Sequence, residues 1–127
     1  MNLLLDTHII LWLAGDCGKL SAKAKQALFD EDNVRYVSIV SAWEAAIKIK
    51  AEKLRFDGGL LEFYRVVDHN DFYETGIKRE YLNLLNGLDD IHKDPFDRLL
   101  IATALAEDFT IVTADENIHK YKVNWLW

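Results

Sequence analysis

Short apolar runs alternate with longer amphipathic segments along this chain of 127 residues. Five of the runs are typical of strands: residues 2–5, 35–37, 72–75, 109–112 and 123–126. The first and fourth are the most continuously apolar, which indicates strands that are buried on both faces of a parallel sheet.

Segments with the 3.6-residue period of helices fill the gaps between these runs. Helices are predicted within residues 20–29, 38–54, 58–67, 78–88 and 94–109. Ser21 and Asp94 are the predicted N-caps of the first and last helices, and Pro95 suits the start of the last. The helix within 38–54 directs one apolar stripe toward the core: Val40, Trp43, Ile47, Ala51 and Leu54. Strands that alternate with helices predict an α/β domain with a mostly parallel sheet.

Composition narrows the class of protein. Half of the residues are hydrophobic and 12% are aromatic, which predicts a packed domain rather than a disordered chain. The longest apolar run, residues 9–14, is too short to span a bilayer, so no membrane association is expected. The single cysteine, Cys17, cannot form an internal disulfide, which fits a reducing cytoplasmic setting.

Charge adds a further constraint. The chain has 21 acidic and 15 basic residues, for a net charge of -6. This balance argues against a protein whose whole surface grips nucleic acid, but it permits a local basic patch and an acidic cluster that holds a divalent cation.

Four acidic residues, far apart in sequence, are predicted to meet at one edge of the sheet. Asp6 and Asp115 follow the strands at 2–5 and 109–112, and ligands of open parallel sheets bind at the carboxyl ends of the strands. Glu44 and Asp97 lie near the starts of two helices, and helices of such folds begin at that same edge.

Clustered carboxylates repel one another, and no lysine or arginine is expected at a strand end to neutralise them. Two ionised groups ~5 Å apart cost roughly 3 kcal/mol at an effective dielectric constant of about 20. Hard divalent cations with oxygen ligands relieve this repulsion, and Mg²⁺ or Mn²⁺ fits better than Zn²⁺. Such sites suit phosphodiester hydrolysis by metal-activated water.

Each acid also has a structural interpretation. Asp6 is a candidate cap for a helix that starts near Thr7, and Asp115 for a short helix after it. Asp97 would be stabilised by the dipole of its own helix, and Glu44 can pair with Lys48 one turn away.

Two histidines near these acids, His8 and His92, are candidate ligands or ordinary hydrogen-bonded loop residues. The sequence alone does not choose between these interpretations.

The stretches "LLLDTHIILWL", "VSIVSAWEAAIKIKAEKL", "HKDPFDRLLIATALAEDFTIVTAD" and "IHKYKV" span nearly the whole chain. In this order they resemble the PIN-domain family, and specifically the VapC-type ribonuclease toxins of type II toxin–antitoxin systems. The motifs "DTH", "SAWE" and "DPFDRLLIATA" are the most specific part of the resemblance.

The resemblance implies a three-layer α/β/α sandwich with about five strands, formed by a single PIN domain over residues 1–127. It also implies a Mg²⁺- or Mn²⁺-dependent endoribonuclease that leaves a 5′-phosphate and a 3′-hydroxyl. The catalytic and metal-binding acids of the family correspond to Asp6, Glu44, Asp97 and Asp115, with Asp94, Thr7 and Thr113 in support. The expected partners are RNA, a cognate antitoxin that occludes the site, and a second copy of the chain in a homodimer.

RNA contacts are expected from basic residues that follow the acids: Lys48, Lys50 and Arg98, with Lys53 and Arg55 nearby. A solvated helix face is the alternative explanation for these charges. Two alternatives to the toxin also stay open: a housekeeping RNA-processing nuclease without an antitoxin, and a non-catalytic interaction module with the same fold. Haloacid-dehalogenase phosphatases fit less well, because they need an aspartate where this chain has His8.

Overall fold

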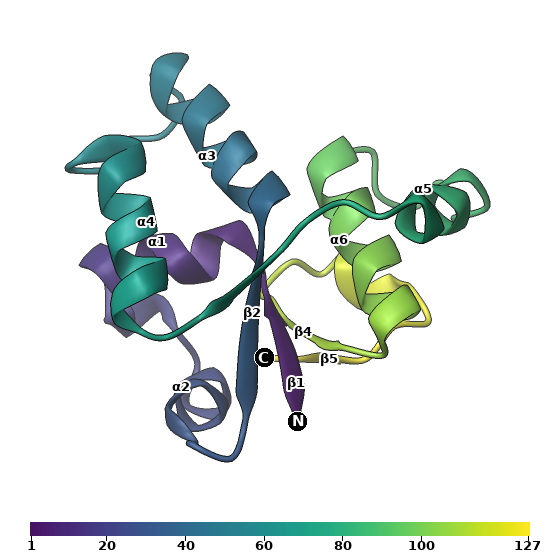
Figure 1. Cartoon of the computed structure of the whole chain (residues 1–127), viewed down its shortest axis with the longest axis horizontal. Helices are drawn as coiled ribbons and strands as arrows, with labels where there is room; N and C mark the ends of the chain where they lie inside the picture. Colours follow the sequence, from purple (N-terminus) through teal and green to yellow (C-terminus); the bar gives the residue numbers. More distant parts are fainter.

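The computed structural model describes the whole chain, residues 1–127. Its centre is a five-stranded sheet with the order β3-β2-β1-β4-β5, and every neighbouring pair is parallel (Figure 1). The strands are β1 (Asn2–Leu5), β2 (Val34–Ser38), β3 (Tyr73–Thr75), β4 (Thr110–Val112) and β5 (Trp125–Leu126). All five predicted strands and the α/β class are thus confirmed.

Six α-helices and two 3-10 turns connect the strands. The α-helices are α1 (Thr7–Gly15), α2 (Ala22–Phe29), α3 (Ile39–Lys50), α4 (Gly59–His69), α5 (Arg79–Asn86) and α6 (Pro95–Glu107). The 3-10 turns are η1 (Cys17–Lys19) and η2 (Ile118–Lys120). None of the helices combines the length and the apolar character that crossing a membrane requires.

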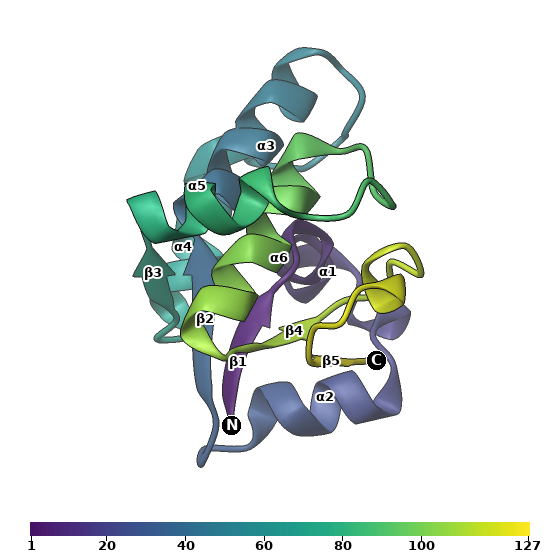
Figure 2. The same cartoon turned by 90° about the vertical axis from the view of Figure 1, so that its right-hand side faces the viewer.

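The helices form layers on both faces of the sheet, which confirms the predicted sandwich. Helices α1, α2 and α4 lie on one side of the sheet, and α5 and α6 lie on the other (Figures 1 and 2). The side chains of β1 alternate accordingly: Leu3 and Leu5 pack with the first set, whereas Leu4 packs with α6. This central strand is apolar on both faces because both are covered.

Local signals in the sequence explain where two helices begin. The Ser21 hydroxyl accepts a hydrogen bond from the backbone N–H of Ala24 and caps α2. Asp94 caps α6 by accepting from the N–H groups of Phe96 and Asp97, with Pro95 at the first helical position. Both N-caps were predicted, and the second one fixes the direction of the helix that carries Asp97.

Helix α3 departs from the prediction. It ends at Lys50, and Glu52 adopts a left-handed φ of 57° in the turn that follows. Trp43 and Ile47 are 59% and 44% exposed, so the expectation that Trp43 lies in the core was wrong. The helix projects beyond the sheet, and its other face contacts α1, α4 and α6 (Figure 1). The apolar stripe therefore overestimated how much of this helix has neighbours.

Candidate metal centre

The carboxyl edge of the sheet gathers the four acids that the sequence singled out. Asp6 follows β1 directly, and Asp115 lies three residues beyond β4. Glu44 is in the second turn of α3 and Asp97 is in the first turn of α6. The start of α3, the start of α6 and the end of β1 all lie in the upper half of Figure 1.

Asp6 is almost completely buried, with 6% of its surface exposed. The Thr113 hydroxyl donates to Asp6 Oδ2 at 2.7 Å, which gives Thr113 the predicted supporting position. Asp6 also caps α1, but the bond from the His8 N–H is long, at 3.4 Å. Burial raises the pKa of Asp6, and the charge of Glu44 adds to this effect. The weak capping bond is therefore too small a gain to offset the free-energy cost of burying the Asp6 carboxylate.

Glu44 is also buried, and each of its oxygens has a partner. The Thr7 hydroxyl donates to Oε1 at 2.5 Å, and Lys48 Nζ lies 2.5 Å from Oε2. Burial lowers the pKa of Lys48, but the hydrogen bond to Glu44 and the charges of Glu44, Asp94 and Asp97 together outweigh this effect, so the net pKa is raised. The pair between Glu44 and Lys48, one helical turn apart, is the one that the sequence offered as an alternative, and it brings a basic group to the acids from α3 rather than from a strand end.

Asp97 has the most strongly perturbed carboxyl group of the site. Burial raises its pKa to about 8, together with the charges of the carboxylates around it: Asp6, Asp94, Glu44 and Asp115. In the first turn of α6 the helix dipole favours the ionised form. The pKa of Asp97 is nevertheless raised, so burial and the neighbouring negative charges outweigh the helix dipole at this position.

His92 joins two of the acids. Its Nε2 lies 2.7 Å from Asp115 Oδ2 and 3.1 Å from Asp97 Oδ2. Its Nδ1 accepts a hydrogen bond from the Asp94 N–H, so Nε2 carries the ring proton and donates to the carboxylates. Burial raises the pKa of Asp115, but the bond from His92 and backbone N–H donors, including that of Asn117, lower it overall. His92 in this orientation is a donor to the acids rather than a metal ligand.

Two groups of side chains have the spacing needed to hold a cation. The ligand atoms of Glu44, Asp94 and Asp97 lie within 4.8 Å of one another, and so do those of His92, Asp97 and Asp115. Asp97 belongs to both groups. The donors other than His92 are carboxylate oxygens, which fits Mg²⁺ or Mn²⁺ and does not fit a thiolate-seeking metal.

The predicted RNA-contacting residues are placed very differently. Lys48 lies among the acids, and Lys50 is exposed on another face of α3. The guanidinium of Arg98 donates to the backbone carbonyls of Leu88, Asp89 and His92. The donors of Arg98 are thus used to hold the loop that contains His92, and we do not propose Arg98 as an RNA contact.

Tyr121 holds the same loop beside Arg98, whose guanidinium lies 3.4 Å from the Tyr121 hydroxyl. Its hydroxyl accepts from the N–H groups of Ile91 and His92, and donates to the carbonyl of Asp89. The sequence analysis did not single out Tyr121, because nothing in its local pattern shows contact with a loop about 30 residues earlier.

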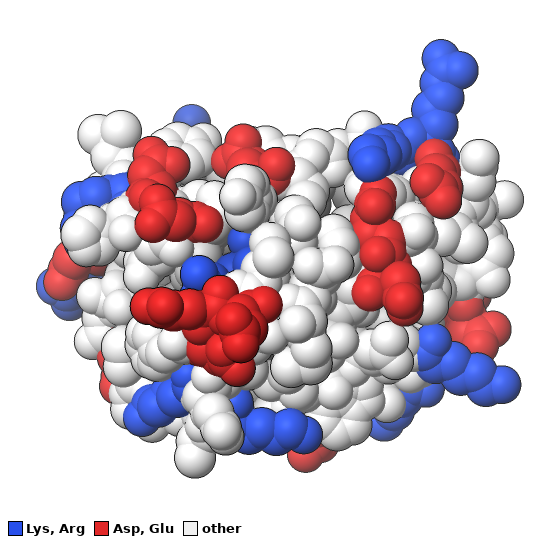
Figure 3. Space-filling view, turned by 60° about the horizontal axis from the view of Figure 1, so that its bottom comes forward, with Lys and Arg blue, Asp and Glu red and all other residues white.

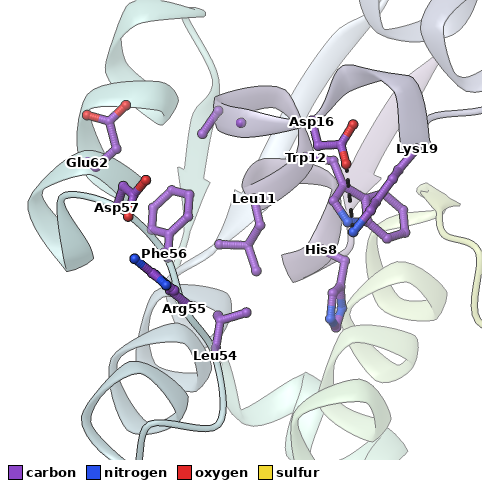
Figure 4. A pocket seen from close by; sticks show the side chains of 12 residues that line it. His8, Leu11, Trp12, Asp16, Lys19, Leu54, Arg55, Phe56, Asp57 and Glu62 are labelled. Atoms are coloured by element: carbon purple, nitrogen blue, oxygen red, sulfur yellow. Dashed lines mark ion pairs between the residues drawn. The ribbon is translucent and has the colours of Figure 1, made fainter.

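A cleft of about 670 Å³ lies beside the acidic edge (Figure 4). Leu11 and Trp12 of α1 line one wall, and Leu54 and Phe56 before α4 line the other. His8 also lines the cleft, and its Nδ1 lies 4.0 Å from Asp6 Oδ1, so this end of the cleft comes close to one of the four acids.

Comparisons with known proteins agree with this arrangement. The chain is 26% identical over 122 residues to Ribonuclease VapC22 of Mycobacterium tuberculosis, covering 95% of this chain and 92% of that protein. Its fold is similar to that of VapBC2 from Rickettsia felis bound to a promoter DNA fragment, with a TM-score of 0.74, 14% identity and coverage of 100% and 99% of the two chains.

A toxin–antitoxin complex from Klebsiella pneumoniae gives a TM-score of 0.65 at 19% identity, with 98% of this chain and 96% of that chain covered. These two structural likenesses concern the fold. The family model that describes the PIN domain matches residues 3–124. Together with the acids at the carboxyl edge of the sheet, this match shows that the chain belongs to the PIN domain family.

Proposed function

We propose that this protein is a metal-dependent endoribonuclease, a single PIN domain over residues 1–127, that acts as the toxin of a toxin–antitoxin pair. The observation that carries the proposal is the convergence of Asp6, Glu44, Asp97 and Asp115 with a pKa of about 8 at Asp97. A site that crowds carboxylates against their own repulsion is typical of one that binds a cation. The relative named Ribonuclease VapC22 supports RNA as the substrate.

The four acids would hold Mg²⁺ or Mn²⁺, with Asp94 in support. The cation supplies Lewis acidity at the phosphate and activates water. The protein's own groups position this chemistry: Thr7 and Thr113 fix the orientations of Glu44 and Asp6, and His92 holds Asp115. Asp97 takes a proton until the cation arrives, because its pKa lies near 8.

An RNA cleavage assay tests the proposal. The purified protein should cleave single-stranded RNA in Mg²⁺ or Mn²⁺, and EDTA should stop the reaction. Products should carry a 5′-phosphate and a 3′-hydroxyl, which end-labelling can distinguish from a 2′,3′-cyclic phosphate. Metal-independent cleavage, or no cleavage of any RNA, would contradict the proposal and favour an interaction module.

The cleft beside the acids supports the antitoxin as partner. A segment that inserts apolar side chains between Trp12 and Phe56 would place its next residues over Asp6. We propose that a basic side chain then enters the acidic cluster, with arginine favoured because its planar guanidinium matches carboxylates. The toxin–antitoxin complex from Klebsiella pneumoniae, similar in fold, supports the partnership. A complex structure with the acidic edge open to solvent would contradict this placement.

We also propose a homodimer in the cytoplasm, where RNA is abundant. Trp43 and Ile47 form an exposed apolar strip on α3, and Trp43 meets the edge of the Phe96 ring at 5.1 Å between ring centroids. A second copy of the chain packed on this strip would remove its apolar surface from water, which favours association. Trp43→Glu should convert the dimer to a monomer in sedimentation velocity, whereas a wild-type monomer would rule the dimer out.

Figure 3 shows the lower end of the molecule, where acidic groups form separate clusters and basic groups lie mainly toward the edges. This face has no continuous basic surface, so it offers no extended track for the RNA backbone. We therefore propose that RNA enters at the carboxyl edge.

A housekeeping nuclease without an antitoxin stays the second candidate, because its site would be the same. A small neighbouring gene for a DNA-binding protein would favour the toxin.

A further inference from the structure

The ammonium group of Lys48 lies against one of the two acidic groups described above, where it forms an ion pair with Glu44. Its Nζ lies 2.5 Å from Glu44 Oε2, and the charges of Asp94 and Asp97 also act on it. Glu44, Asp94 and Asp97 are the three carboxylates whose oxygens lie within 4.8 Å of one another. The chain thus supplies its own cation where a second metal ion would otherwise be expected.

Lys48 is also open to a ligand. Its side chain is 34% exposed, whereas that of Glu44 beneath it is 4% exposed. An ammonium group has three N–H donors, and the structure pairs Lys48 only with Glu44. The remaining donors have no partner in the protein, and the ion pair with the buried Glu44 holds the nitrogen in place. A phosphate oxygen is the ligand that such a fixed, partly exposed cation would attract.

We propose that Lys48 is a catalytic residue whose ammonium group contacts a non-bridging oxygen of the scissile phosphate and replaces a second metal ion. The inference rests on the nuclease function proposed above. On this inference Glu44 holds Lys48 instead of a metal ion, and the single metal ion is held by Asp97 and Asp115, with Asp6 nearby. Asp97 belongs to both groups, so its carboxylate lies between the metal ion and the ammonium group of Lys48.

The reaction that Lys48 assists is a hydrolysis. A bond forms between the water oxygen and phosphorus, and the bond between phosphorus and the 3′ oxygen breaks, with its electron pair leaving on that oxygen. The water releases one proton to the solvent, and the 3′ oxygen takes one up. Lys48 transfers no proton in this scheme. Its charge stabilises the extra negative charge on the phosphate oxygens in the transition state.

A simple helix ion pair is the competing explanation. Lys48 and Glu44 are four residues apart on α3, and such pairs contribute little when exposed. A purely structural pair predicts that removing Lys48 changes stability slightly and leaves both the chemistry and the metal stoichiometry unchanged. The two explanations therefore differ in measurable quantities.

Single-turnover cleavage at saturating Mn²⁺ gives the first measurement. We expect Lys48→Met to slow cleavage by about 10²–10³-fold, the loss typical of removing one electrostatic stabiliser of a transition state. Lys48→Arg keeps the charge and should stay within about tenfold of wild type. Lys23→Met is the matched control, because Lys23 is an exposed residue of α2 at the opposite end of the sheet. It should cleave at the wild-type rate.

Mn²⁺ binding, followed by electron paramagnetic resonance, gives a second measurement that needs no RNA. Wild type and Lys48→Arg should bind one Mn²⁺ per chain. Lys48→Met should bind the first Mn²⁺ at least as tightly, because a repelling charge is gone, and should take up a second. Tighter binding with slower cleavage is a combination that misfolding cannot produce. Two Mn²⁺ ions per wild-type chain would overturn the inference.

The outcomes also separate this inference from the proposed function. If wild type cleaves RNA and Lys48→Met cleaves equally fast, the role of Lys48 is wrong and the nuclease stands. If wild type cleaves no RNA with any metal, the proposed function is wrong, and the catalytic role of Lys48 is wrong with it.

Discussion

At the scale of single residues, Asp97 connects stability to pH. Its pKa is about 8 in the folded protein, because of burial and then the neighbouring carboxylates, and about 4 in an unfolded chain. The protonated form is therefore favoured by folding. The stability that it contributes is fully present below pH ~4 and is lost as pH rises through about 8. The metal-free protein is thus weakened by this residue at neutral pH.

We predict that Asp97→Asn abolishes cleavage and raises the melting temperature in EDTA. Asparagine keeps the shape and removes the ionisation, so the gain over wild type should grow from pH 5 to pH 8. Thermal melts across this range, beside single-turnover assays in Mn²⁺, test both parts. Asp68→Asn, at an exposed position of α4, is the control and should change neither. A folded Asp97→Asn variant with wild-type cleavage would refute the assigned role.

His92 gives a second prediction. Its Nε2–H holds Asp115, so His92→Ala should cost about 10–100-fold in Mn²⁺ affinity, as expected for a group that orients a metal ligand. His92→Gln offers an amide N–H donor and should recover part of the loss. Calorimetric titration with Mn²⁺ measures both variants. Equal loss in both would mean that the ring is needed only to fill space.

The sequence identified the four acids because chain topology alone brings the ends of parallel strands to one edge. It offered His92 as a ligand or a loop residue, and Lys48 as an RNA contact or a partner of Glu44, without choosing between these roles. The tautomer of His92 depends on the N–H of Asp94 two residues away. The position of the Lys48 ammonium group depends on the geometry of α3, which brings it to Glu44. These are distances between side chains, which a pattern of residue types does not contain.

At the scale of elements, α1 and the segment before α4 form the cleft that leads to the acids. We predict that Trp12→Ala lowers affinity for the antitoxin at least tenfold and leaves RNA cleavage intact, because buried aromatic anchors dominate such interfaces. Calorimetry with the protein encoded beside this gene measures the change. Trp125→Ala, which removes an indole stacked on His119 outside the cleft, is the control. Equal losses in both variants would place the partner elsewhere.

Helices and strands were predictable to different degrees. The strands were found because continuous apolar runs such as residues 2–5 have few other interpretations in a chain of this composition. Helix α6 was found because Asp94 and Pro95 mark its start. Helix α3 was located, but its buried face was wrong, because Trp43 meets only the edge of the Phe96 ring and stays 59% exposed. Periodicity shows which side of a helix is apolar, and only the fold shows what lies against it.

At the scale of the whole molecule, the acidic site works against folding until a cation binds. We predict that Asp6→Asn melts higher than wild type in EDTA at neutral pH, because burial raises the pKa of Asp6 and its charge opposes folding there. Saturation with Mg²⁺ at 100 times its dissociation constant would add about 2.7 kcal/mol to wild-type stability. The mutant should gain less. An Asp6→Asn protein that melts several degrees lower in EDTA would show that capping α1 is the main role of this residue.

The bond between Thr113 and Asp6 joins residues 107 positions apart, and it sets the order in which the protein can become active during synthesis. The central strand β1 emerges from the ribosome well before its neighbour β4 and the acid that follows β4. A nascent chain without them lacks the strand that pairs with one edge of β1, and it also lacks Asp115 of the proposed catalytic cluster. The proposed nuclease is therefore inactive while most of its own message is still being translated.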